Sequence, residues 1–147
     1  MSLDRAQLVD DLELLRATVA WKCSVLTDEQ ARWPGELMTA AGILWHLALV
    51  ENTMYDVVVT GRPERWAEQL EAGREAAFAV GLDLPVDELR SAYQDNVELC
   101  REALEDRSLE DPVGFAGDQL VTVATVVEYL VKETARHLEL LRGLIGE

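Results

Sequence analysis

The sequence contains few of the residue types that carry chemistry in most enzymes. It has only two histidines and two cysteines, and its 13 basic residues face 28 acidic ones. Cys23 and Cys100 are too far apart in the sequence to form a redox motif or a metal-ligand spacing. Each lies on the apolar face of a predicted helix, so we expect both to be small, buried core residues.

The shortage of basic residues excludes one class of partner. The net charge is −15, and no cluster of lysine or arginine interrupts the acidic sequence. A chain of this charge is repelled by phosphate backbones unless a local basic patch overrides the field. We therefore expect no nucleic-acid partner.

Long hydrophobic runs are also missing. The longest, Thr39 to Val50, is interrupted by His46 and is followed at once by Glu51. It is too short to cross a bilayer, so we expect no membrane partner. The first residues are acidic and amphipathic, without the basic-then-apolar order of a signal peptide. These features predict a cytoplasmic protein.

No run alternates between apolar and polar residues, so the sequence predicts no β-strand. The 147 residues fit one domain, expected to span 1–147. Apolar residues recur at steps of three and four over four long segments, which is the repeat of one helix face. The segments are Leu8–Leu26, Ile43–Val58, Leu89–Leu104 and Val123–Leu144.

Capping signals bound these helices. Thr27 begins a capping-box pattern that predicts one short helical turn after the first helix. Thr39 is suited to cap the second long helix, and Pro85 to open the third. The connection over 61–84 is long for a bundle and is expected to be a packed loop with some helix. The sequence thus predicts an all-α four-helix bundle with a long crossover connection between helices two and three.

Both histidines are expected to face the core. On the second long helix, Glu51, Asn52 and Asp56 mark the expected solvent side, and His46 lies roughly 135° from their centre. On the fourth, His137 lies opposite the exposed charges. Glu133, four residues earlier, is rotated only about 40° from His137.

An inward carboxylate needs compensation, because burying it unpaired costs several kcal/mol. A divalent metal shared by Glu133 and His137 would supply it, since both side chains lie on one side of the helix. A hydrogen bond from Arg136 or His137 to Glu133 at a half-exposed boundary would also supply it. Spacing alone leaves both interpretations open.

Three segments resemble the DinB-like superfamily, in its branch of mycothiol-dependent, maleylpyruvate isomerase-like enzymes. They are Thr39–Glu51 (TAAGILWHLALVE), Leu26–Arg32 (LTDEQAR) and Lys132–Gly146, with its KETARH and LLRGLIG stretches. The resemblance implies a four-helix bundle with a long link between helices two and three. It also implies a metal site that joins one histidine of helix two to two histidines of helix four, holding zinc, nickel or a similar divalent ion.

Carried onto this sequence, His46 and His137 match two of the ligands, and the second helix-four histidine is missing. Either Glu133 replaces it, giving a site of two histidines and one carboxylate with open positions, or the site is degenerate. We expect His46, Glu133 and His137 to be the metal ligands.

The resemblance implies a transferase or isomerase with a small-molecule substrate that uses a divalent metal and a low-molecular-weight thiol such as mycothiol. No catalytic residue stands out, although Tyr129, one turn before Glu133, is within reach of the site. The alternative is a metal-free helical bundle that binds a small ligand or dimerises. Because the second helix is apolar around much of its circumference, we expect either a homodimer or a cover formed by residues 61–84.

Overall fold

Six helices and two short strands make up the residues that the computed structural model describes, which are 5–34, 37–60, 66–114 and 120–146. In chain order they are α1 (Arg5–Ser24), α2 (Asp28–Ala31), α3 (Ala40–Thr60), α4 (Trp66–Asp83), α5 (Val86–Glu105), β1 (Pro112–Gly114), β2 (Leu120–Thr122) and α6 (Val123–Leu144).

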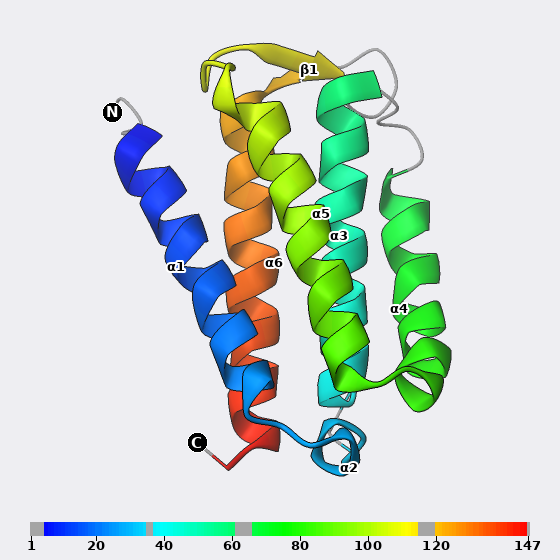
Figure 1. Ribbon diagram of the computed structural model, residues 1–147. Helices are drawn as coiled ribbons and strands as arrows, with labels where there is room; N and C mark the ends of the chain where they lie inside the picture. Colours follow the sequence, from blue (N-terminus) through cyan, green and yellow to red (C-terminus); the bar gives the residue numbers. More distant parts are fainter. Residues whose placement is uncertain (1–4, 35–36, 61–65, 115–119, 147) are drawn as a thin grey trace.

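Helices α1, α3, α5 and α6 form a four-helix bundle (Figure 1). Helix α3 packs against α5 and α6, and α1 packs against α6 and more loosely against α5. The course of the chain in Figure 1 shows that α3 and α5 run in one direction and α1 and α6 in the other. The predicted bundle and its crossover between the second and third long helices are therefore confirmed.

The crossover is more regular than the sequence analysis expected. Residues 66–83 form one continuous helix, α4, rather than a packed loop with some helix. It lies against the outer side of α3, and two glycines permit a close approach. A Cβ at Gly73 would lie 2.8 Å from Leu49 Cδ1, and one at Gly81 would lie 3.0 Å from the Gly42 nitrogen. Helix α4 thus covers part of the apolar surface of α3.

The expectation of no strand is wrong in one place. Strands β1 and β2 form a two-stranded antiparallel ladder in which Val113 pairs with Val121. Each strand has only three residues, which is too short for an alternating pattern to be visible in the sequence. The ladder closes the connection between α5 and α6 at one end of the bundle (Figure 1).

Three helix starts follow the predicted capping chemistry. Thr27 and Gln30 form the complete capping box of α2. The Thr39 hydroxyl accepts a hydrogen bond from the Gly42 amide at 3.0 Å, at the start of α3. Pro85 occupies the cap position of α5, where its missing amide proton is not needed.

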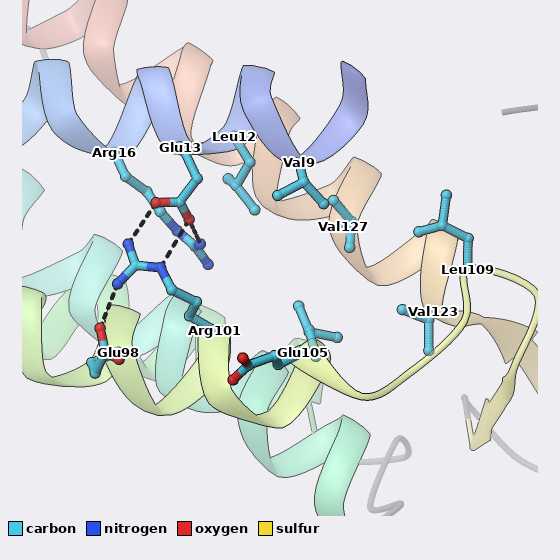
Figure 2. A pocket seen from close by; sticks show the side chains of 11 residues that line it. Val9, Leu12, Glu13, Arg16, Glu98, Arg101, Glu105, Leu109, Val123 and Val127 are labelled. Carbon is cyan, nitrogen blue, oxygen red and sulfur yellow. Dashed lines mark hydrogen bonds and ion pairs between the residues drawn. The ribbon is translucent and has the colours of Figure 1, made fainter. Parts of the chain in front are cut away.

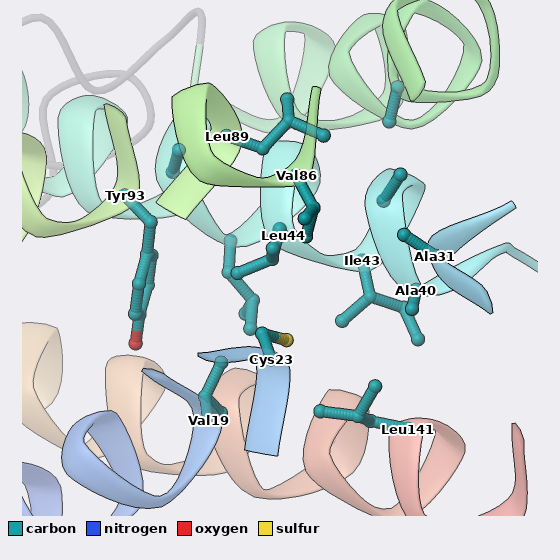
Figure 3. Packing of buried hydrophobic residues seen from close by; sticks show 14 of the residues in the cluster. Val19, Cys23, Ala31, Ala40, Ile43, Leu44, Val86, Leu89, Tyr93 and Leu141 are labelled. Atoms are coloured by element: carbon teal, nitrogen blue, oxygen red, sulfur yellow. The ribbon is translucent and has the colours of Figure 1, made fainter. Parts of the chain in front are cut away.

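The apolar core is divided into two clusters along the bundle. One contains Val19, Ile43 and Leu141, and the other contains Leu12, Met54 and Leu130. Figure 3 shows the first cluster, with side chains of several helices pointing toward one another. Seven polar side chains of the described residues are buried as well: Arg16, Lys22, His46, Glu51, Thr53, Thr134 and His137. The two candidate histidines therefore lie inside the bundle.

Cys23 and Cys100 are free and fully buried, as predicted. Burial raises the pKa of each thiol to about 12. Among the described residues, no helix is both long and apolar enough to span a bilayer.

Candidate metal centre

His46 lies on α3, and Glu133 and His137 lie one turn apart on the facing side of α6. Both histidines are 2 % exposed, as the helical phases predicted. Four residues correspond to slightly more than one helical turn, so Glu133 and His137 project from α6 on the same side. The packing of α3 against α6 then brings His46 to this pair.

The three side chains converge. One ligand atom from each lies within 4.8 Å of the other two, and the two imidazole ring centroids are 4.6 Å apart. Ligand atoms that each lie about 2.1 Å from one ion are separated by roughly 3.3–4.2 Å. Small side-chain rotations therefore suffice to close the cluster around a cation.

The hydrogen bond of His137 favours the tautomer that a metal requires. Its Nδ1 lies 2.8 Å from the backbone carbonyl oxygen of Glu133, to which an Nδ1–H group donates. Nε2 then carries a lone pair. Metal-ligating histidines typically donate their other ring N–H in this way, which fixes the ring orientation.

His46 differs from His137 in its hydrogen bonding. Its Nδ1 is buried and has no hydrogen-bond partner among the described residues. A buried polar atom without a partner costs about 1–3 kcal/mol. Beside two further candidate ligands, such an atom indicates that the cluster is suited to hold a further species.

The electrostatics keep both imidazoles in their neutral, metal-binding form at neutral pH. Burial is the larger cause that lowers the pKa of His46 from 6.5 to about 4, and the nearby His137 is the second. Burial also lowers the pKa of His137, against the opposing effect of Glu133. More distant positive charges on Arg74 of α4 and Arg136 contribute in the same direction as burial.

Glu133 is ionised in this surrounding. Burial alone would raise its pKa, but the hydrogen bond and the charge of Arg136 outweigh burial and lower it. Arg136 Nη2 lies 2.8 Å from Glu133 Oε2, and His137 Nδ1 lies 3.3 Å from the same oxygen. The hydroxyl of Tyr129 also hydrogen-bonds to Glu133. The carboxylate is thus oriented from both neighbouring turns of α6.

The donor set fits a divalent ion. Two neutral imidazoles and one carboxylate are ligands that zinc and similar borderline cations prefer, and three protein ligands leave positions open for water or substrate. The fit rests on the convergence of the three groups and on the unpartnered Nδ1 of His46. The cost of a buried Glu133 is a weaker argument than the sequence analysis assumed, because Arg136 already compensates its charge.

One assignment from the sequence was wrong. Glu51 was expected on the solvent side of α3, yet it is 1 % exposed and paired with Arg16 of α1. Helical phase places a residue only relative to its own helix, so the partner on α1 could not be seen. Asn52 is exposed and Asp56 is intermediate in exposure, which agrees with the expected side.

Two solved structures share the fold of this chain. The chain superposes on the crystal structure of a point mutant of mycothiol-dependent maleylpyruvate isomerase with a TM-score of 0.74 and 16 % identity. A second crystal structure of mycothiol-dependent maleylpyruvate isomerase gives 0.65 and 17 % identity. At this identity the likeness establishes the fold.

Both alignments cover 94 % of this chain and 61 % of the other, so the chain spans about three fifths of the length of these isomerases. A search of curated proteins finds no significant match. The model of the mycothiol-S-transferase family matches residues 7–146, which is nearly the whole chain. The chain therefore belongs to the mycothiol-S-transferase family, and the resemblance to the DinB-like superfamily is confirmed.

Proposed function

We propose that the chain is a metal-dependent enzyme that transfers or isomerises a small molecule with mycothiol or a similar thiol. His46, Glu133 and His137 hold the divalent metal, for which zinc or nickel is expected. The observation that carries this proposal is the convergence of these three side chains, whose ligand atoms lie within 4.8 Å of one another. Membership of a family named for mycothiol S-transfer supports the choice of thiol.

The thiol has to come from outside the chain. A thiolate is the reactive form, and a nucleophilic cysteine has a lowered pKa and partial exposure. The two cysteines of this chain are buried, and the pKa of each is raised to about 12. Neither can serve as nucleophile at neutral pH, which supports a separate low-molecular-weight thiol.

A bound divalent ion supplies Lewis acidity, which lowers the pKa of a thiol that binds beside it. The chain contributes the surroundings. His46 and His137 offer neutral imidazoles. Glu133 offers a negatively charged carboxylate, which the ion pair with Arg136 orients. Burial and Glu133 raise the pKa of Tyr129, so its hydroxyl stays protonated at neutral pH and acts as a donor.

A second function is favoured by one observation. The Arg136–Glu133 ion pair compensates the carboxylate without any metal, as a metal-free bundle would require. Such a protein would bind a small ligand or dimerise. In that case His46 and His137 would be core residues, and the unpartnered Nδ1 would be a tolerated defect.

Metal analysis of protein purified without an affinity tag separates the two. The enzyme should contain about one divalent ion per chain, and His46→Ala should contain none. Loaded protein should then accelerate the conjugation of mycothiol with monochlorobimane, while the His46→Ala variant should not. Untagged protein that contains no metal and takes up none on dialysis against zinc or nickel would favour the metal-free bundle.

We retain a single cytoplasmic domain and a homodimer as parts of the proposal. The apolar excess of α3 no longer requires a partner, because α4 covers much of it. A different surface supports the dimer: Leu14 and Trp21 of α1, and Val25 directly after this helix, are each at least 65 % exposed. A monomeric mass by light scattering at micromolar concentration would contradict the dimer.

A further inference from the structure

A groove separates α1 from α5, away from the candidate metal centre. It consists of two adjoining hollows of about 390 and 320 Å³, which have Glu13, Arg16, Glu98 and Arg101 in common. Hollows of this size accommodate small organic molecules. Neither is lined by His46, Glu133 or His137.

The first hollow is apolar at one end and charged at the other (Figure 2). Val9 and Leu12 of α1 face Val123 and Val127 of α6, and Leu109 closes this end. The charged end holds a bridge between the helices: Arg101 Nη2 lies 2.5 Å from Glu13 Oε2. Because both partners are partly exposed, this ion pair contributes only about 0–1 kcal/mol and can rearrange around a ligand.

Buried polar groups line the floor of the groove. Arg16 is 5 % exposed and lines both hollows. Tyr93 is 1 % exposed and lines the second hollow, and its hydroxyl has no hydrogen-bond partner among the described residues. In Figure 3 this hydroxyl points from α5 toward the α1 and α6 side of the bundle. An unpaired buried hydroxyl can accept or donate a hydrogen bond. A ligand that supplies the matching donor or acceptor therefore stabilises it.

The charge of the groove selects among apolar ligands. Glu13, Glu98 and Glu105 line it, and Glu51 accepts two hydrogen bonds from Arg16 at its floor. Three carboxylates and two guanidinium groups thus line the groove, in a chain of net charge −15. The field of the site and of the whole protein therefore favours a cation over an anion.

We propose that this groove is a second binding site, which takes a hydrophobic amine with its apolar body between α1 and α6 and its ammonium group among Glu13, Glu98 and Glu105. Burial of the body supplies the affinity, and the carboxylates accept the ammonium N–H groups. The site is independent of the metal and of the proposed thiol chemistry.

Isothermal titration calorimetry of the full chain with n-octylamine, 1-octanol and octanoate tests the proposal, because the three share an apolar chain and differ in head-group charge. We expect octylamine, protonated at pH 7, to bind most tightly, octanol about tenfold more weakly, and octanoate least. Each methylene removed from the amine should weaken binding about fourfold. Octanol or octanoate binding as tightly as octylamine, or no saturable binding of any of them, would overturn the proposal.

Two variants locate the site. Val9→Trp fills the apolar end and should weaken octylamine at least tenfold, whereas Val59→Trp, at an exposed position of α3 outside the groove, should not. Glu105→Gln should weaken octylamine severalfold and leave octanol unchanged, while the exposed Glu102→Gln should change neither. Binding that survives both Val9→Trp and Glu105→Gln, or that disappears in His46→Ala, would place the amine elsewhere and refute the site.

Discussion

Arg16 of α1 and Glu51 of α3 form a two-point ion pair inside the bundle, with Arg16 Nε 2.9 Å from Oε2 and Nη2 2.5 Å from Oε1. The two side chains are 5 % and 1 % exposed. Burial alone would lower the pKa of Arg16, but Glu51 outweighs burial and raises it, so the guanidinium stays charged. The pair links α1 to α3, although each of these helices packs mainly against other neighbours.

Removal of one partner should destabilise the protein strongly. Glu51→Leu leaves the Arg16 guanidinium buried without its main counter-charge, and Glu13 alone remains to pair with it. We expect a loss of about 3–5 kcal/mol in the free energy of unfolding, measured by urea denaturation.

The double variant Arg16→Met with Glu51→Leu is the control. Replacing both charges by apolar groups of similar volume removes the unpaired charge, and the stability should return to within about 1–2 kcal/mol of the wild type. Equal losses in the single and double variants would show that packing, rather than charge, explains the effect.

The stability of the metal-free protein should fall between about pH 6.5 and pH 4. The pKa of His46 is lowered from 6.5 to about 4 in the folded state, so the unfolded chain binds a proton in this window and the folded chain does not. The stability is therefore highest above the pKa that His46 has in the unfolded chain. It is lost as the pH falls toward the pKa that His46 has in the folded state. His46 should account for a loss on the order of 2–3 kcal/mol, which urea denaturation at a series of pH values would measure.

His46→Leu separates this contribution from that of His137, whose pKa burial also lowers. The variant should lose less stability than the wild type over the same pH range. Parallel pH profiles for the two proteins would contradict the assignment to His46.

The bundle could be predicted from the sequence because its evidence is local. Each long helix has a continuous stripe at a period of 3.6 residues, and Thr27, Thr39 and Pro85 are capping signals that act within a few residues. Helix α4 was less visible, because glycine disfavours helix and this segment contains Gly73 and Gly81, which in the structure permit contact with α3. Tertiary packing, which a single sequence does not show, stabilises this helix.

The candidate site was predictable only in part. The helical phases placed His46, Glu133 and His137 inward, and the structure brings the three together. The pairing of Arg136 with Glu133 depends on side-chain conformations, which a sequence does not show. The same is true of the missing partner of His46 Nδ1. Glu51 was misplaced because its counter-charge, Arg16, is 35 positions away. Pairing between helices has no signature in helical phase.

Removal of the metal should lower the melting temperature, because a ligand that binds only the folded state stabilises it by about 4 kcal/mol at 1,000 times its Kd. Glu133→Gln keeps the shape of the side chain and removes its charge, so metal affinity should drop while the bundle survives. Glu139→Gln is the matched control, since Glu139 pairs with Arg142 at 2.7 Å on the same helix and at the same spacing. Equal metal affinity in the two variants would exclude Glu133 as a ligand.

Tyr129 should affect the metal through Glu133 rather than by direct contact. Its hydroxyl hydrogen-bonds to the carboxylate from one turn earlier on α6, and Tyr129→Phe removes only this oxygen. Loss of such a supporting hydrogen bond typically lowers metal affinity 10- to 100-fold. We expect a loss of about tenfold, measured by competition with a chelator, and an altered visible spectrum of the cobalt-substituted protein. Tyr55→Phe on α3, which packs against the same core cluster as Tyr129, is the control and should change neither measurement. Wild-type affinity and an unchanged cobalt spectrum in Tyr129→Phe would show that Arg136 alone orients Glu133.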